Sequence, residues 1–295
     1  MNSSALALRI VEILFPLFAI TALGFAAGKR MRPDLHHANR LSMDVFTPSL
    51  TFAALAGHEF HLTSYLPLLA ACLLYLILAA LSGLALAKVG NWQVRTVLPP
   101  MTFNNSANLG LPLAVFAFGE QALAPAVALF ILTSLAHFSF GAWLLDRSIR
   151  LRTVWRVPTV FAALLGVLVS VLGIPVWPPL MTAIKMLGDV AIPMMLFALG
   201  VRIAQSKIES MRLGLAVAVA RPVSGMFIAW ALARALHLPP EQAALFMVYG
   251  SLPPAVLNFM FAERYRQEPE KVASIVLVGN MAALFSLPVA LALVL

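Results

Sequence analysis

The sequence predicts an all-α integral membrane protein of ten transmembrane helices, arranged as two inverted repeats of five. Three observations support this fold class. Hydrophobic residues fill 61% of the 295 positions and charged residues only 11%, whereas soluble proteins carry roughly half apolar and about a quarter charged residues. Apolar segments follow one another along the whole chain, and a short motif of the first half recurs in the second.

Ten apolar segments reach or approach the length of about 20 residues that a helix needs to cross the hydrocarbon core. Helices satisfy their backbone polar groups within one segment, as lipid requires. The expected spans are residues 10–28, 41–57, 64–87, 96–118 and 121–145 in the first half, and 157–174, 179–201, 213–236, 243–262 and 272–295 in the second.

The net charge of +8 is distributed over short clusters between the apolar segments, so there is no single patch for nucleic acid. Positive residues mark the cytoplasmic side of a membrane protein. Sixteen of the 20 Lys and Arg residues lie in the loops after the odd-numbered spans, namely Lys29, Arg30, Arg32, Arg40, Lys88, Arg95, Arg147, Arg150, Arg152, Arg156, Arg202, Lys207, Arg212, Arg264, Arg266 and Lys271. We therefore expect both termini on the outer side.

The sequence contains no signature of a cofactor or an enzyme. Its single cysteine, Cys72, lies in an apolar segment and excludes disulfides and cysteine metal sites. Neither a nucleotide-binding Gly-x-x-x-x-Gly-Lys-Ser/Thr loop nor a His-Glu-x-x-His or Gly-x-Ser-x-Gly motif occurs. We expect no cofactor beyond a coupling proton or sodium ion, and no catalytic activity.

An internal repeat divides the chain into residues 1–146 and 147–295. Asp44, Pro48 and Phe52 of the second segment recur at the same spacing in the seventh, as Asp189, Pro193 and Phe197. Because each half holds an odd number of expected spans, the second half enters the membrane from the opposite side. Inverted repeats of this kind are typical of alternating-access transporters.

The fourth and ninth segments contain residues that interrupt transmembrane helices. Proline lacks an N–H donor, and Asn competes for backbone hydrogen bonds. Paired breaks in corresponding helices indicate a substrate site, where the start of a half-helix attracts anions. The expected substrate-binding residues are Asn104, Asn105, Asn108, Gly110, Pro112, Pro253, Pro254 and Asn258.

Three ionisable residues within apolar segments, Asp44, Asp189 and Arg221, are candidates for ion coupling. Each also has a structural interpretation. Asp44 follows Arg40 by one turn and suits the membrane interface, and Asp189 follows Lys185 by four residues and suits an ion pair. Arg221 suits a side chain that reaches toward the cytoplasmic surface.

These residues resemble the auxin efflux carrier family, which includes plant auxin carriers and bacterial transporters of malate, malonate and other small carboxylates. The resemblance covers nearly the whole chain. It lies in Asn105, Ser106, Gly110 and Pro112, with Ala107 in place of a family Gly, in Asp189, Pro193, Leu196 and Gly200, and in Pro253, Ala255, Ala262 and Tyr265. An Asn of many bacterial members corresponds to Leu257, and Asn258 is one position further on.

The resemblance implies that the fourth and ninth helices cross as broken helices, with the substrate beside the crossing. One helix bundle would move as an elevator against a scaffold, in a homodimer in a bacterial inner membrane. The expected function is secondary transport of a mono- or dicarboxylate, by proton symport or uniport. A sodium-coupled carrier like the related bile acid symporters is the alternative, followed by a channel or a membrane enzyme.

Overall fold

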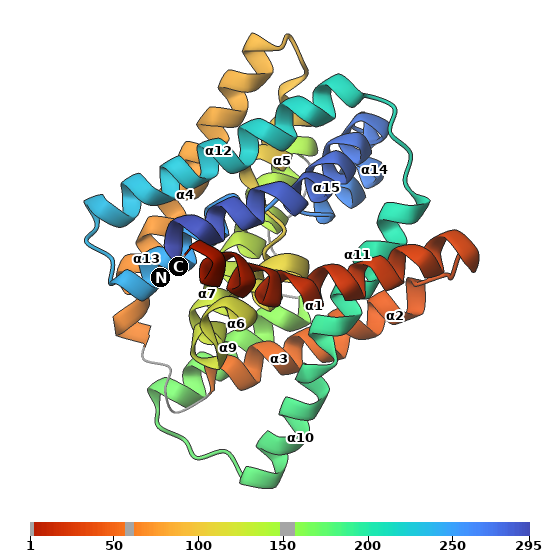
Figure 1. Cartoon of the computed structure of the whole chain (residues 1–295). Coiled ribbons are helices and arrows are strands. Elements are labelled where there is room, and N and C mark those ends of the chain that lie inside the picture. Colours follow the sequence, from red (N-terminus) through yellow and green to blue (C-terminus); the bar gives the residue numbers. More distant parts are fainter. Residues whose placement is uncertain (1–2, 57–61, 148–156) are drawn as a thin grey trace.

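A computed structural model describes residues 3–56, 62–147 and 157–295 (Figure 1). The described residues form helices and connections, and the one β-type contact among them is an isolated antiparallel bridge between Asn104 and Pro254. The expected all-α class is confirmed for this part of the chain. Arg150, Arg152 and Arg156, which belong to the expected cytoplasmic charge, lie outside the described residues.

The first half of the chain alternates long helices with short or interrupted ones. Its elements are α1 (Ser3–Arg30), α2 (His36–Leu41), η1 (Ser42–Phe46), α3 (Thr47–Leu55), α4 (Leu62–Val89), α5 (Val94–Thr102), η2 (Ser106–Gly110), α6 (Leu111–Phe118), η3 (Glu120–Ala122), α7 (Leu123–Ala136), η4 (His137–Gly141) and α8 (Ala142–Leu145). Three of them, η1, η2 and η4, are single π-helical turns. Such turns are rare and often occur at functional sites.

The second half contains α9 (Pro158–Val171), α10 (Pro178–Asp189), α11 (Ala191–Gln205), α12 (Met211–Ala235), α13 (Pro240–Ser251), α14 (Leu257–Arg264) and α15 (Pro269–Val294). Proline stands in the first turn of α9, α10, α13 and α15, where its missing N–H leaves no hydrogen bond unmade. These prolines set where the helices begin.

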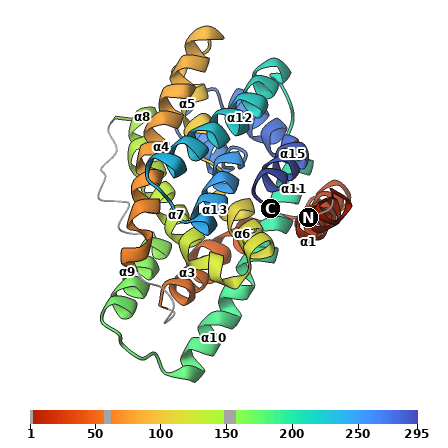
Figure 2. The ribbon, with the colours of Figure 1, turned by 60° about the vertical axis from the view of Figure 1, so that its left-hand side comes forward.

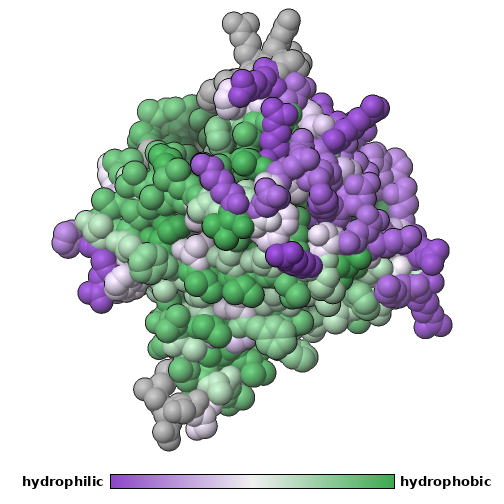
Figure 3. Space-filling model, turned by 90° about the horizontal axis from the view of Figure 1, so that it is seen from above, coloured by the Kyte–Doolittle hydropathy of each residue, from purple (hydrophilic) through white to green (hydrophobic). Residues whose placement is uncertain are grey.

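Six segments of the described chain are long and apolar enough to cross a membrane, namely Ser4–Arg30, Thr63–Val89, Glu120–Leu145, Pro178–Gln205, Met211–Ala235 and Pro269–Val294. Large apolar side chains on these helices, such as Phe15, Phe227 and Phe285, are not covered by protein. Figure 3 shows a broad hydrophobic area on one face, with hydrophilic residues gathered at one side. Because water does not tolerate an apolar surface of this extent, the chain is an all-helical membrane protein.

The other four expected spans coincide with shorter or interrupted helices. The described residues of the span 41–57 fall on the end of α2, on η1 and on α3, and residues 157–174 contain the 14-residue helix α9. Residues 96–118 and 243–262 each contain a break between two helices. Length and hydropathy alone therefore do not qualify these segments as uninterrupted spans.

The helices pack in two groups. In one group α1 lies along α11, and α3 packs against α9 and α10. In the other, α12 packs against α13, α15 and α4, and α4 packs against α5. Both ribbon views show α1 beside α11 and α3 beside α9 (Figures 1 and 2).

Small residues bring α1 and α11 close together. A Cβ atom at Gly28 would lie 2.7 Å from the Cβ of Ala204. Gly24, one turn earlier, faces the backbone of Phe197 in the same way. Pairs of small residues four positions apart let transmembrane helices approach closely. This contact anchors the first helix to the second half of the chain.

Candidate functional site

Two helices of the second group are interrupted. α5 ends at Thr102 and η2 begins at Ser106, with Phe103 in an extended conformation (φ −99°, ψ 110°) between them. α13 ends at Ser251 and α14 begins at Leu257, so Pro253 and Pro254 lie between these two helices. Since proline cannot donate the backbone hydrogen bond that would continue a helix, the second break follows from the sequence.

The two interruptions lie side by side and satisfy one another's backbone groups. The N–H of Asn105 donates to the carbonyl of Pro253 at 2.8 Å, and the N–H of Ala255 donates to the carbonyl of Phe103 at 3.0 Å. Asn104 and Pro254 form the antiparallel bridge between these two contacts. Irregular backbone within a membrane protein needs such partners, because lipid offers none.

Asparagine side chains complete this junction. The Asn104 amide donates to the carbonyl of Tyr249 at 2.8 Å, and the Asn258 amide donates to the carbonyl of Phe103 at 3.1 Å. The Asn105 amide donates to Oδ1 of Asn280 at 2.8 Å. Asn280 in turn donates to the carbonyl of Pro254 at 3.0 Å. Sequence reasoning missed Asn280, because a single Asn within an apolar helix belongs to no recognisable pattern.

A cavity of about 420 Å³ lies beside the junction, within the size range of small-molecule sites. Its wall combines residues of all three π-helical turns with residues of α7, α9, α11 and the segment after Pro254. Polar side chains and apolar ones such as Met194, Leu199 and Met260 both line it. Since η2 contacts both α11 and α13, and α7 contacts both α3 and α4, the cavity lies where the two groups meet.

The structure brings part of the expected binding set to this cavity. Asn104, Asn105 and Asn108 line it. The other expected residues do not line this cavity. Gly110 and Pro112 lie in the continuous helix Ser106–Phe118 after the first break, and Pro253, Pro254 and Asn258 lie at the second. Leu257 does line the cavity. Thus Asn258 holds the two breaks together, while its neighbour faces the cavity.

The wall contains a cationic side chain that sequence reasoning assigned to a loop. The seventh expected span ends at residue 201, but α11 continues to Gln205 and includes Arg202. Arg202 lines the cavity, and its Nη1 atom is buried without a hydrogen-bond partner. Neither ion pair found among the described residues involves it. The assignment of Arg202 to a loop is therefore corrected.

His137 also contributes to the wall, from η4. Its ring stacks on Phe103 with centroids 4.1 Å apart and meets the edge of Phe261 at 5.0 Å. Its Nε2 atom is buried and has no hydrogen-bond partner. This histidine fits the junction closely, and one of its ring nitrogens has no hydrogen-bond partner.

The two acidic candidates are placed differently. Asp44 lines the cavity and forms an ion pair with Arg40 at 3.5 Å, with 47% of its side chain uncovered. This arrangement agrees with the interfacial interpretation. Asp189 ends α10, is exposed and does not line the cavity. The expected pairing of Asp189 with Lys185 is not found within 4.0 Å.

Arg221 is fully enclosed by protein. The interpretation that it reaches toward the membrane surface is therefore wrong. Its Nη1 donates to the hydroxyl of Tyr75 at 2.7 Å and to the carbonyl of Gly250 at 3.2 Å. It does not line the cavity beside the junction. No cluster of three or more potential metal ligands occurs among the residues that the structure describes.

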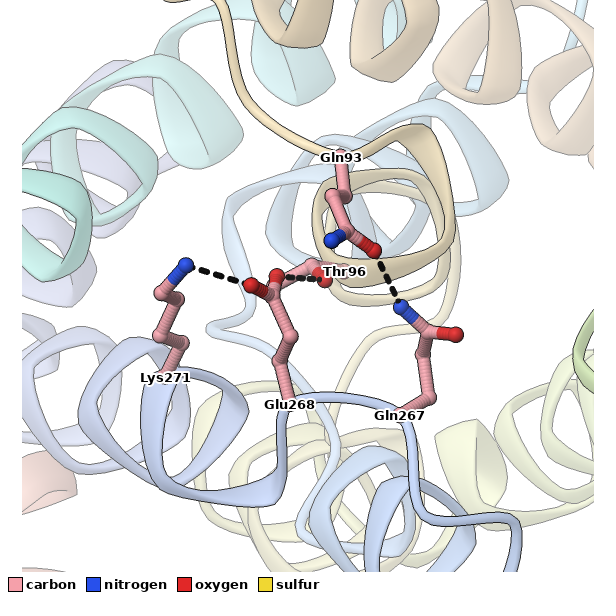
Figure 4. Close-up of polar contacts among 5 residues, drawn as sticks. All are labelled: Gln93, Thr96, Gln267, Glu268 and Lys271. Carbon is pink, nitrogen blue, oxygen red and sulfur yellow. Dashed lines mark hydrogen bonds and ion pairs between the residues drawn. The ribbon is translucent and has the colours of Figure 1, made fainter.

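A polar cluster ties the start of α5 to the turn before α15 and to the first turn of that helix (Figure 4). The Thr96 hydroxyl donates to Glu268 at 2.5 Å, the Lys271 ammonium pairs with the same carboxylate, and Gln267 donates to Gln93 at 2.7 Å. Desolvation acts to raise the pKa of Glu268, but the hydrogen bonds from Lys271 and Thr96 lower it below its ordinary value. The carboxylate thus joins the start of α5 to the turn between α14 and α15.

Comparisons with known proteins agree on one class. The sequence profile of the family described as membrane transport protein matches residues 142–291. An uncharacterized transporter of Methanocaldococcus jannaschii is 21% identical over 227 residues, which cover 72% of this chain and 72% of the relative.

Proposed function

Because the chain belongs to the auxin efflux carrier family of membrane transport proteins, we propose that it is a secondary transporter of a small organic anion. The substrate, a mono- or dicarboxylate, binds in the cavity beside the interrupted helices. Asn104, Asn105 and Asn108 contact it. Gly110 and Pro112 shape the helix after the first break, and Pro253, Pro254 and Asn258 shape the second break.

The buried Nη1 atom of Arg202, which has no hydrogen-bond partner, carries this proposal. Arg202 lines the cavity, and a buried donor without a partner is unfavourable. A carboxylate satisfies such a donor with a strong, charge-assisted hydrogen bond. The negative charge of Asp44 in the same wall is already paired with Arg40. Glu263 attracts Arg202 electrostatically but does not line the cavity and forms no ion pair with Arg202 within 4.0 Å. The wall therefore keeps a cationic group that favours an anion.

Other groups of the wall would orient the substrate. The helix that begins at Ser106 has no side-chain cap at its N-terminus, and free N–H groups at such ends attract anions. Oδ1 of Asn104 and Nε2 of His137 are buried in the wall without partners. As a hydrogen-bond acceptor, Oδ1 of Asn104 suits a hydroxyl group on the substrate.

The proposed transport mechanism is alternating access of the elevator type. The sequence supports this mechanism, because it predicts ten spans in two inverted repeats of five, residues 1–146 and 147–295. So does the position of the cavity between two helix groups, since walls from both groups can separate. The protein would act as a homodimer in a bacterial inner membrane, with both termini outside and protons as the coupling ion.

Thermal shift of the purified protein in detergent, over a panel of mono- and dicarboxylates with and without a hydroxyl group, tests the proposal. We expect one carboxylate to stabilise the wild type. Arg202→Gln should weaken its binding about tenfold to hundredfold, since a hydrogen bond to a charged group contributes about 1.5–3 kcal/mol. Arg212→Gln, at an exposed position in α12, is the matched control.

Asn105→Ala and Pro112→Ala test the first interrupted helix, and both should weaken the same stabilisation. If no carboxylate stabilises the wild type, or if Arg202→Gln binds the carboxylate as tightly as Arg212→Gln does, an anion site in this cavity is excluded.

A further inference from the structure

Arg221 lies halfway along α12 with no exposed surface. Neither ion pair found in the described part of the chain involves it. Its Nε and Nη2 atoms are buried without partners. A fully enclosed guanidinium with no acid beside it is costly in a membrane protein, so its charge requires another form of compensation.

That compensation comes from the end of a half-helix. Nη1 of Arg221 donates at 3.2 Å to the carbonyl of Gly250, in the last turn of α13, before the break. The Tyr75 hydroxyl donates to the same carbonyl at 3.4 Å, and the Tyr75 ring lies 5.8 Å from the guanidinium carbon. Terminal carbonyls give the end of a helix a partial negative charge, and an aromatic ring attracts a cation.

The backbone is built to let the guanidinium reach this carbonyl. A Cβ atom on Gly225 would lie 2.6 Å from Nη1 of Arg221, and a Cβ on Gly250 would lie 2.5 Å from the carbonyl oxygen of Gly225. Any larger residue at either position would separate α12 from α13. The contact therefore depends on two glycines that face each other.

The other carbonyls at this helix end also accept side-chain donors. The Ser251 hydroxyl donates to the carbonyl of Val248 at 2.7 Å, and the Asn104 amide donates to that of Tyr249 at 2.8 Å. In ion-coupled carriers with interrupted helices, such half-helix ends and unwound carbonyls coordinate the sodium ion. Here Ser251, Asn104 and Arg221 already occupy these carbonyls.

We infer that Arg221 is a fixed internal cation that takes the place of a sodium ion at the end of α13. The substrate then binds beside the junction without bound sodium. This inference rests on the proposed function for its link to transport. Arg221 acts as a positioning residue, because it fixes the backbone at Gly250. The carbonyl of the preceding residue, Tyr249, orients Asn104 in the cavity wall.

Sodium binding is measured first on the wild-type protein alone, by thermal shift in sodium chloride against matched choline and potassium chloride. We expect the same melting temperature in the three salts, because a guanidinium already fills the site. A stabilisation specific to sodium overturns the inference, whether or not a carboxylate binds. Absence of carboxylate binding in every salt contradicts the proposed function alone.

Variants then test the charge itself. Arg221→Met keeps the length of the side chain and should weaken carboxylate binding about tenfold or more, with partial recovery in added guanidinium or sodium chloride. Arg221→Lys should bind nearly as the wild type does. Arg234→Met, in the same helix at an exposed position beside Trp230, is the control.

Wild-type affinity in a folded Arg221→Met protein overturns the inference. So does a folded Arg221→Lys protein that behaves like Arg221→Met, because a role of charge requires that lysine substitutes. If Arg221→Met does not fold, the Arg221→Lys protein and the sodium measurement decide the question.

Discussion

Asn105 and Asn280 join the first interrupted helix to the last helix of the chain through an amide–amide hydrogen bond of 2.8 Å. Asn280 also donates to the carbonyl of Pro254 in the second interruption. The buried side chain of Asn280 in α15 thus contacts both breaks. Its hydrogen-bond partner Asn105 lines the cavity.

Asn280→Ala should therefore destabilise the protein without removing a cavity contact. It leaves the Asn105 amide and the Pro254 carbonyl without this partner, which costs about 1–3 kcal/mol for a buried group. A lower melting temperature in detergent checks this. Asn108→Ala is the matched comparison, because Asn108 lines the cavity. It should weaken carboxylate binding and keep the wild-type melting temperature, and the opposite pattern in the two variants would contradict this division of roles.

The stability of the contact between α5 and the turn before α15 should depend on pH through Glu268. Its pKa lies below the ordinary value in the folded protein. The carboxylate therefore stabilises the fold above the unfolded-state pKa of about 4.3, and this stability is lost as the pH falls through the folded-state pKa. Melting curves between about pH 6 and about pH 2 should show a smaller fall for Glu268→Gln than for the wild type. Glu270→Gln, at an exposed position two residues later, should keep the wild-type fall; equal slopes for wild type and Glu268→Gln would remove the role of Glu268.

Asp44 is the proposed proton-coupling residue, since its carboxylate lines the cavity and is paired with Arg40. Asp44→Asn should abolish the pH dependence of carboxylate uptake into proteoliposomes, because the asparagine cannot exchange a proton. Asp34→Asn controls for loss of a nearby surface charge, as Asp34 accepts a hydrogen bond from the His36 backbone outside the cavity. Unchanged pH dependence in Asp44→Asn would discard the coupling role.

The predicted orientation can be read from cysteine labelling. The single cysteine, Cys72, has no exposed surface, so the wild type should stay unlabelled by a membrane-impermeant maleimide. Lys185→Cys, at an exposed position in α10, should react in intact cells, because Lys185 is expected on the outer side. Lys88→Cys should react only after permeabilisation. The reverse pattern would invert the proposed topology.

Sequence alone located the two helix breaks, because their cause is local. Pro253 and Pro254 lack the N–H that a continuous helix needs, and the polar run from Asn104 to Pro112 disfavours one. Composition alone also determined the membrane class, since a chain with 61% apolar residues is far more hydrophobic than soluble proteins are. The sequence identified Asn104, Asn105 and Asn108 as a group because they lie within five residues of one another.

Only the tertiary structure decided the roles of the two arginines and of Asn280. An arginine in the last turn of a helix faces water or a cavity according to its neighbours in space, and Arg202 faces a cavity between helices that are distant in sequence. Arg221 contacts Tyr75 and Gly250 from two other helices. Asn280 likewise acts on residues of the two breaks. Side-chain partners of this kind follow from packing, which no local pattern encodes, so the charge balance of the site emerged only from the folded chain.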